Sequence, residues 1–382
     1  MYISDRVHYV GVNDKELDLF EGLYIVPNGM SYNSYVIIDE KIAVMDTVEV
    51  RFGEKWLKNV ENALQGRQPD YLIVQHMEPD HSANISLFMQ KYPKAKVVAT
   101  RQAFVMMQNY FGTDYADRRE VAGDGDSLFL GKGNLQFITA PMVHWPEVMM
   151  AYDTQDKILF SADAFGKFGA LDKEEEWVCE ARRYYFGIVG KYGVQVRAVL
   201  QKLRLLDIRM ICSLHGSILD KNVQSCLGLY ETWSNYEAEE DGVCIAYTSV
   251  YGNTKKAVEY LAEELKSRGV KVSVFDLART DVAEAIEDAF KYSKSVFATT
   301  TYNGGIFPFM REFLFGLAER NYQKRRVGLI ENGSWSPMAA QGMKEYLDKC
   351  ERLQFIQPTV KILSSPTQET YAQLRALADA LI

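Results

Sequence analysis

From Gly242 onwards, apolar segments and helical stretches alternate strictly, and this rhythm is the strongest constraint that the sequence places on a fold. The apolar segments are Cys244–Thr248, Lys271–Asp276, Ser295–Thr299, Arg326–Ile330 and Val360–Leu363. Strands that alternate with helices form a parallel sheet with helices on both faces. The C-terminal part is therefore predicted to be a doubly wound, five-stranded parallel sheet, whose ligand lies beyond the carboxyl ends of the strands.

The chain before Gly242 is organised differently. Its apolar strands are Ser34–Ile38, Ile42–Met45, Tyr71–Gln75, Val97–Thr100, Leu135–Ala140, Met149–Tyr152 and Ile158–Ser161. Strands follow one another closely at 34–46 and 148–161, which is typical of mixed sheets rich in hairpins. The acidic segment 237–242 ends in glycine and has the composition of an exposed connection. We therefore predict two domains, residues 1–240 and 241–382, of the α+β and α/β classes.

Composition excludes several classes of partner. The net charge of −8 repels phosphate backbones, so no nucleic-acid partner is expected. No apolar stretch approaches the roughly 20 residues that a bilayer requires, and the N-terminus lacks an apolar signal-peptide core, so no membrane partner is expected either. The five cysteines are scattered and never form a Cys-x-x-Cys pair, which fits reduced thiols. These features predict a cytoplasmic protein.

Residues 76–81, His-Met-Glu-Pro-Asp-His, place four metal-capable side chains directly after an apolar strand. Three further candidates each follow a separate strand, and the full set is His76, Glu78, Asp80, His81, His144, Asp163 and His215. A single histidine after a strand is usually an ordinary loop residue, but strand ends that share one sheet edge bring their side chains together. Four imidazoles and three carboxylates suffice for two metals with a bridging carboxylate, whereas one tetrahedral zinc needs about four ligands.

Three loops of the C-terminal part form a candidate site for a phosphate-bearing flavin. The segment 248–254 offers hydroxyls, a glycine and fresh helix amides, and it lacks the Gly-Lys-Ser/Thr ending of a nucleotide-hydrolysing P-loop. Two later loops, 300–305 and 331–336, follow the third and fourth strands. The candidate cofactor-binding residues are Ser249, Val250, Tyr251, Gly252, Asn253, Thr254, Thr301, Tyr302, Asn303, Gly304, Asn332, Gly333, Ser334 and Trp335. Tyr302 or Trp335 would stack on the ring system or shield it, the alternative being that these aromatics merely cap the core.

Together, these motifs resemble the flavodiiron proteins, also called A-type flavoproteins, over essentially the whole chain. The resemblance rests on the hexapeptide 76–81, on segments 141–147 and 159–166, on His215-Gly216 and on the flavodoxin-like loops. The hexapeptide also resembles the His-x-His-x-Asp-His of metallo-β-lactamase-fold hydrolases, with Glu78 in place of the second histidine. Added carboxylate oxygen suits iron better than zinc. The resemblance implies a metallo-β-lactamase-like αββα sandwich followed by a flavodoxin-like domain.

The resemblance also implies a non-haem diiron centre and FMN. By the family's pattern, His76, Glu78 and His144 would hold one iron, Asp80, His81 and His215 the other, and Asp163 would bridge them; these seven residues are the candidate catalytic residues. The family reduces dioxygen to water, nitric oxide to nitrous oxide, or both. The sequence ends without a rubredoxin-like module, so a separate electron donor is expected, rubredoxin first. A head-to-tail homodimer, or a dimer of dimers, would set the flavin of one chain against the diiron site of another.

Two alternatives compete with this interpretation. One is a zinc-dependent metallo-β-lactamase-like hydrolase fused to a flavodoxin-like domain, against which Glu78 and the flavin loops argue. The other is an electron-transfer flavoprotein whose metal domain is vestigial, against which the full set of seven candidate ligands argues.

Overall fold

Residues 2–173 and 176–382 are described by the computed structural model of the chain. The chain separates into two units, Met1–Glu231 and Thr232–Ile382, and the division falls near the end of helix α7 (Val223–Ser234). The predicted boundary between residues 240 and 241 lies inside strand β16 (Glu240–Tyr247). The segment before that strand packs on the second unit, because the carbonyl of Tyr236 accepts a hydrogen bond from Nη1 of buried Arg325 at 2.7 Å. The exact domain boundary stays a prediction.

Unit 1 contains two main sheets. The first has the order β1 (Val7–Tyr9), β6 (Tyr35–Ile38), β7 (Ile42–Met45), β8 (Tyr71–Ile73), β9 (Lys96–Ala99) and β10 (Arg119–Val121). The second has the order β11 (Ser127–Phe129), β12 (Asn134–Thr139), β13 (Met149–Asp153), β14 (Ile158–Phe160) and β15 (Met210–Cys212). Two small ribbons pair β2 (Val12–Asp14) with β5 (Met30–Tyr32), and β3 (Leu19–Phe20) with β4 (Tyr24–Ile25).

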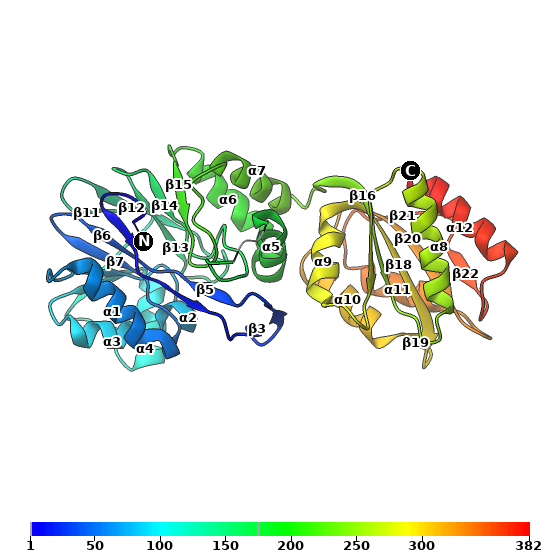
Figure 1. Ribbon diagram of the computed structural model, residues 1–382, viewed down its shortest axis with the longest axis horizontal. Coiled ribbons are helices and arrows are strands. Elements are labelled where there is room, and N and C mark those ends of the chain that lie inside the picture. Colours follow the sequence, from blue (N-terminus) through cyan, green and yellow to red (C-terminus); the bar gives the residue numbers. More distant parts are fainter. Residues whose placement is uncertain (1, 174–175) are drawn as a thin grey trace. The chain divides into compact units, whose positions relative to one another are not determined.

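Helices cover the outer faces of these sheets. The helices of unit 1 are α1 (Gly53–Leu64), α2 (Pro79–Ser82), α3 (Ile85–Lys91), α4 (Arg101–Phe111), α5 (Trp177–Tyr184), α6 (Gly193–Leu203) and α7, with short turns at Val50–Phe52, Tyr185–Val189 and Gly190–Tyr192. Figure 1 shows α1, α3 and α4 on the side of the first sheet and α5 to α7 on the side of the second. Between the sheets, Ile37 and Ile73 pack in one core with Phe137 and Phe160. The predicted αββα sandwich is confirmed.

The predicted strands of unit 1 are right in position and differ at their ends. The predicted strand Tyr71–Gln75 stops at Ile73, because Gln75 leaves the ladder and its side-chain amide donates to the carbonyls of Met149 at 3.1 Å and Phe160 at 2.7 Å. The sequence analysis missed β1 to β5, β10 and β11. These strands are two or three residues long, which is too short to show the alternation on which the prediction rests.

Arg6 joins the two main sheets of unit 1. Its guanidinium bonds Asp39, just after β6, at 2.6 Å and Asp153, at the end of β13, at 2.5 Å, and both carboxylate side chains are 1% exposed. Replacing Arg6 with alanine would leave two buried carboxylates without their cation, so we expect a loss of about 3 kcal/mol in the free energy of unfolding. Denaturant unfolding measures this. Lys15→Ala breaks an exposed pair with Asp172 and should cost less than about 1 kcal/mol; equal losses in both variants would contradict the prediction.

Unit 2 is a single parallel sheet between helices. Its strands run in the order β17 (Val272–Asp276), β16, β18 (Tyr292–Tyr302) and β20 (Arg326–Asn332), and β20 then pairs with β21 (Gln354–Phe355) and β22 (Val360–Ile362), while β19 (Gly305–Ile306) forms a hairpin with β18. The helices are α8 (Asn253–Ser267), α9 (Val282–Lys291), α10 (Pro308–Glu319), α11 (Ala339–Leu347) and α12 (Gln368–Leu381). Figure 1 shows α8 and α12 on one face and α9 and α10 on the other.

This strand order is that of a doubly wound, flavodoxin-like sheet, so the predicted fold of unit 2 is confirmed. One detail differs from the prediction. The fifth strand position is divided between β21 and β22, and Pro358 lies between them. Proline has no N–H to donate to a ladder, which accounts for the interruption.

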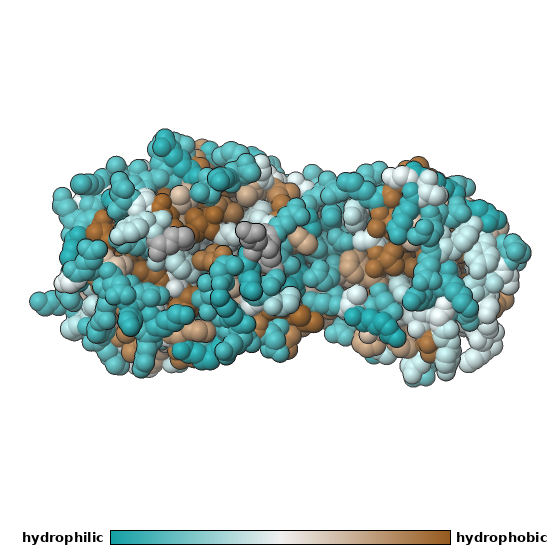
Figure 2. Space-filling view, viewed as in Figure 1, coloured by the Kyte–Doolittle hydropathy of each residue, from teal (hydrophilic) through white to brown (hydrophobic). Residues whose placement is uncertain are grey.

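The surface carries mainly polar side chains. In the view of Figure 2, hydrophilic residues cover most of both units, with smaller hydrophobic patches among them. Within residues 2–173 and 176–382, no helix combines the length and the apolar character that crossing a bilayer requires.

Candidate metal and flavin sites

The hexapeptide 76–81 forms the turn after β8 and the first turn of α2. His76 and Glu78 lie in the turn, and Pro79 opens the helix, where its fixed φ suits the first helical position. Asp80 and His81 follow within the helix, and the His81 N–H donates to the Glu78 carbonyl at 2.9 Å. The turn and the helix therefore place four candidate ligands close together within one short segment.

The other three candidates come from the second sheet. His144 lies in the loop between β12 and β13, Asp163 follows β14, and His215 follows β15. The His215 loop is held by Asn33, whose side-chain amide donates to the carbonyls of Ser213 and Gly216, both at 2.9 Å. All seven predicted metal residues are brought together at the ends of the two sheets.

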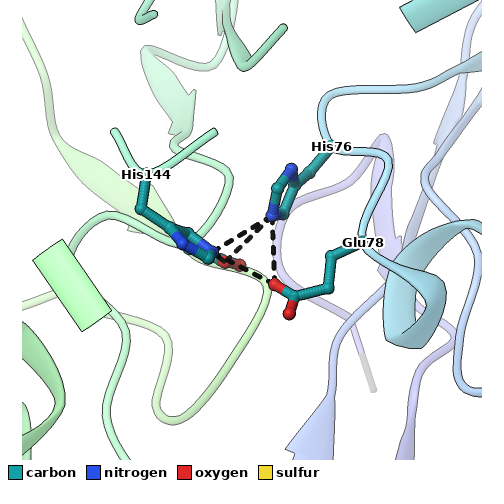
Figure 3. A group of neighbouring side chains, drawn as sticks. His76, Glu78 and His144 are labelled. Carbon is teal, nitrogen blue, oxygen red and sulfur yellow. Dashed lines mark hydrogen bonds and ion pairs between the residues drawn. The ribbon is translucent and has the colours of Figure 1, made fainter. Parts of the chain in front are cut away.

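The candidate ligands form two adjoining sets. In the first, Nε2 of His76 lies 3.2 Å from Oε2 of Glu78 and 3.2 Å from Nε2 of His144, and Figure 3 shows the three side chains pointing toward one another. In the second, Nε2 of His215 lies 2.9 Å from Nε2 of His81 and 3.3 Å from Oδ2 of Asp80.

Asp163 lies between these two sets. Its Oδ2 is 3.1 Å from Nε2 of His144, in the first set, and its Oδ1 is 3.2 Å from Nε2 of His81, in the second. One carboxylate oxygen thus faces each group of donors, which is the placement that a bridging ligand requires.

These donors fit metal ions. Metal–ligand bonds of about 2.0–2.2 Å place neighbouring donors roughly 2.8–3.6 Å apart, as observed in both sets. Both carboxylate oxygens of Asp80 and Oδ1 of Asp163 are buried and make no hydrogen bond with any described residue. Imidazole nitrogens lie near two of these oxygens, at 3.3 Å from Oδ2 of Asp80 and 3.2 Å from Oδ1 of Asp163. Buried carboxylate oxygens are costly unless positive charge satisfies them, so the arrangement suits two adjacent cations.

The site also balances its charges internally. Burial alone would lower the pKa of His144, but Asp163 and Glu78 raise it to about 9. Burial alone would raise the pKa of Glu78, but the imidazoles of His144 and His76 hold it well below its ordinary value. Without a metal, His144 and Glu78 therefore stabilise each other in their charged forms.

Glu21 is a member of this site that the sequence analysis missed. It lies in the turn between β3 and β4 with part of its surface exposed, and the loss of solvation beside the site together with repulsion from Glu78 raises its pKa to about 7. It lines a cavity of 250 Å³ that also touches Glu78 and Asp80. The sequence around Glu21 contains no pattern that predicts its place at the site. Only the folding of the β3–β4 hairpin brings Glu21 beside candidate ligands that are more than fifty positions away in the sequence.

Several residues around the site have left-handed backbone conformations. Positive φ angles occur at Asp46 (51°), Met142 (63°), Ala162 (51°) and Phe165 (65°). Such angles are uncommon for residues other than glycine, and they cluster at functional sites where the surrounding structure maintains them. Ala162 directly precedes Asp163, so one of these uncommon backbone angles lies next to a candidate ligand.

Unit 2 contains a cavity of 690 Å³ beyond the carboxyl ends of its strands, within the range of small-molecule sites. Every predicted cofactor-binding residue except Gly252 lines it. It is lined further by Thr300, Ser336, Met338 and Ser364. Met338 and Ser364 were not predicted, because Met338 lies two residues beyond the predicted loop 331–336 and Ser364 belongs to a later loop without a recognisable pattern.

The first loop of this cavity is organised to receive an anion. Oγ of Ser249 accepts hydrogen bonds from the N–H groups of Gly252 at 3.1 Å and Lys255 at 3.2 Å, and α8 begins at Asn253. None of the described residues that line the cavity is charged, so a phosphate would be held by amides and hydroxyls. Tyr251 and Trp335 are each 92% exposed at the cavity, so both rings are available to a bound molecule.

Comparisons with known proteins cover both units. Residues 30–216 match the family described as ODP family beta lactamase, and residues 244–360 match a flavodoxin domain. The anaerobic nitric oxide reductase flavorubredoxin of Vibrio vulnificus is 28% identical over 349 residues, which cover 88% of this chain and 70% of that protein.

Solved structures extend the comparison. The rubredoxin oxygen:oxidoreductase of Desulfovibrio gigas has a TM-score of 0.91 and 25% identity, over 100% of this chain and 97% of that chain. The flavodiiron protein of Giardia intestinalis has the same fold, with a TM-score of 0.87 and 24% identity over 100% of this chain and 97% of that chain. The two domains in this order, each with its site, and relatives that match across both, show that the chain belongs to the flavodiiron protein family.

Proposed function

We propose that this oxidoreductase reduces dioxygen to water, nitric oxide to nitrous oxide, or both, at its diiron centre, with electrons delivered through FMN. FMN and two non-haem irons are the cofactors of the family to which the chain belongs. The observation that carries the proposal is the pair of three-residue ligand sets with Asp163 between them. A pair of redox-active metal ions held by these residues would supply electrons for the reduction of either gas.

In this proposal, one iron would be held by His76, Glu78 and His144, and the other by Asp80, His81 and His215, with Asp163 shared between the two positions. Burial supports these roles, since His76, His81 and His215 have no exposed surface and Asp163 is 1% exposed. These rings are thereby fixed by their surroundings, whereas Glu78 and Asp80 border the 250 Å³ cavity. The loops around the 690 Å³ cavity, including Ser249–Thr254, bind FMN.

A separate protein would supply the electrons, and rubredoxin is the donor that we propose. The name of the Desulfovibrio gigas relative includes both rubredoxin and oxygen. We further propose a head-to-tail homodimer, or a dimer of dimers, in which the flavin of one chain serves the diiron site of another.

Parallel gas-consumption assays test the proposed activity. Purified, iron-loaded protein is reduced under anaerobic conditions and then mixed with dioxygen or with nitric oxide in separate vessels. We expect rapid oxidation of the flavin and consumption of at least one gas, and the two rates establish the preference. A reduced protein with two irons and FMN that consumes neither gas would refute the proposal.

Metal analysis separates this function from that of a zinc hydrolase with the same fold. We expect close to two irons per chain in protein produced with iron available, because carboxylate oxygens alongside imidazoles suit iron. Stoichiometric zinc without iron, under the same conditions, would favour the hydrolase.

Metal uptake should release protons. The pKa of His144 is raised to about 9 and that of His76 well above its ordinary value, so both rings carry protons at pH 7 in the metal-free protein. A ring nitrogen must lose its proton to bind a metal, so binding should strengthen as the pH rises toward about 9 and weaken below it. A weakly buffered titration with ferrous iron and a pH indicator measures the release. Binding without proton release would contradict this charge assignment.

A further inference from the structure

Glu147 contacts one candidate ligand in a way that no other carboxylate matches among the described residues. Its side chain is 0% exposed, and its Oε1 accepts hydrogen bonds from Nδ1 of His76 at 2.8 Å and from the N–H of Met77 at 2.8 Å. Because Oε1 already accepts from Met77, Nδ1 of His76 acts as the donor. The proton is thereby kept on Nδ1, and Nε2 is left free to face Glu78 and His144.

The surroundings make this contact rigid. The hydroxyl of Thr100 donates to the backbone carbonyl of Glu147 at 3.0 Å, which anchors the loop that carries the carboxyl group. The ring of Trp145 stands edge-on to the ring of His76, with the centroids 5.2 Å apart. The other oxygen of Glu147, Oε2, is buried and has no hydrogen-bond partner in the described part of the chain, so the side chain acts chiefly on His76.

The second ligand set lacks an equivalent carboxylate. Nδ1 of His215 donates to the backbone carbonyl of Ser31 at 2.8 Å, a neutral acceptor. Nδ1 of His81 is buried without a partner among residues 2–173 and 176–382. A carboxylate behind a metal-bound imidazole makes the ring a stronger ligand, whereas a neutral carbonyl does so less. The two metal positions therefore have different support, although each has two imidazoles and one terminal carboxylate.

We propose that Glu147 is a positioning residue that makes the two irons unequal, so that the position formed by His76, Glu78 and His144 fills first and empties last. This inference rests on the proposed diiron function and adds an order of loading to it. The removal of such a supporting partner typically weakens metal binding about 10- to 100-fold. The effect should fall on one position and spare the other.

The test compares wild-type protein with Glu147→Gln by anaerobic titration with ferrous iron against a competing chelator. Glutamine keeps an oxygen that can accept from His76 and Met77 but removes the negative charge. In wild-type protein we expect two separate binding steps, and Mössbauer spectra at one iron per chain should show a single species. In Glu147→Gln the tighter step should weaken about 10- to 100-fold, and the spectrum at one iron per chain should become a mixture.

A matched control is Glu61→Gln, which removes a carboxylate of the same unit that pairs with Lys91 at the surface, with its side chain 46% exposed. It should keep the two wild-type binding steps. Thermal unfolding checks that Glu147→Gln folds as wild type does, and the wild-type spectrum tests the inference without any variant. Equal affinities in wild type, or unchanged steps in Glu147→Gln, would overturn the role of Glu147. Wild-type protein that cannot bind two irons would instead refute the proposed function, and the inference with it.

Discussion

Replacing Asp163 with alanine should reduce the iron content from two per chain to one or none and lower the gas-reduction rate at least about 100-fold. Loss of a group that only supports a ligand already costs up to about this factor, and Asp163 faces both sets of donors directly. FMN should stay bound, because its cavity is lined by residues of the other unit. Iron analysis, flavin absorbance and gas consumption of the same preparation measure the three quantities.

Asp172→Ala is the control for this experiment. Asp172 is a carboxylate of the same unit whose side chain is 47% exposed and pairs with Lys15 at the surface. The variant should retain both irons and its activity. If Asp163→Ala kept two irons and turned over normally, the bridging role would be wrong, and a vestigial metal domain would become the better interpretation.

Replacing Gly252 with valine should have the complementary result, with FMN weakened and iron retained. Gly252 has a φ of 87° at the start of α8, and a Cβ atom added there would meet nothing within 4 Å. The cost is therefore backbone strain alone, about 1–2 kcal/mol. It corresponds to a roughly five- to thirtyfold weaker hold on FMN, because the valine loop relaxes from this conformation in the free protein and must regain it to bind the flavin. Fluorescence titration of the apoprotein with FMN measures the change.

Gly252→Asn separates strain from other effects. Asparagine tolerates left-handed backbone better than a β-branched residue, so this variant should bind FMN more tightly than Gly252→Val. Equal losses in the two variants would show that the conformation of this residue does not limit flavin binding. If both variants bound FMN as tightly as wild-type protein, the phosphate of FMN would have to bind away from this loop.

The sequence was sufficient to predict the fold wherever a pattern was long. The alternation after Gly242 predicts the order of strands and helices in unit 2, and the hexapeptide 76–81 places four metal-capable groups after one strand. The apolar strands that precede Asp163 and His215 identify two further sheet-edge positions. Each of these predictions depends only on the residue types within one short segment. In the structure, each of these segments lies where the prediction places it.

Contacts between distant segments could not be predicted in this way. Glu147 acts through His76, and Glu21 acts beside Glu78, only because the loops that carry them fold back on the site. The segment around Glu21 has no recognisable pattern, and the motif 141–147, which ends in Glu147, does not itself indicate a contact with His76. The division of the fifth strand of unit 2 is caused locally by Pro358. The sequence predicts only the part from Val360 onwards, because the two-residue strand before the proline is too short to show an apolar pattern.

The hydrogen bonds of Asn33 have a consequence for the maturation of this protein. They tie the loop of His215 to a segment made 180 residues earlier, which lies between β5 and β6. The ribosome must therefore synthesise most of the first unit before the last proposed ligand can join the others. Before His215 has been synthesised, the set of proposed ligands is incomplete. The metal is therefore inserted near the end of translation or after it.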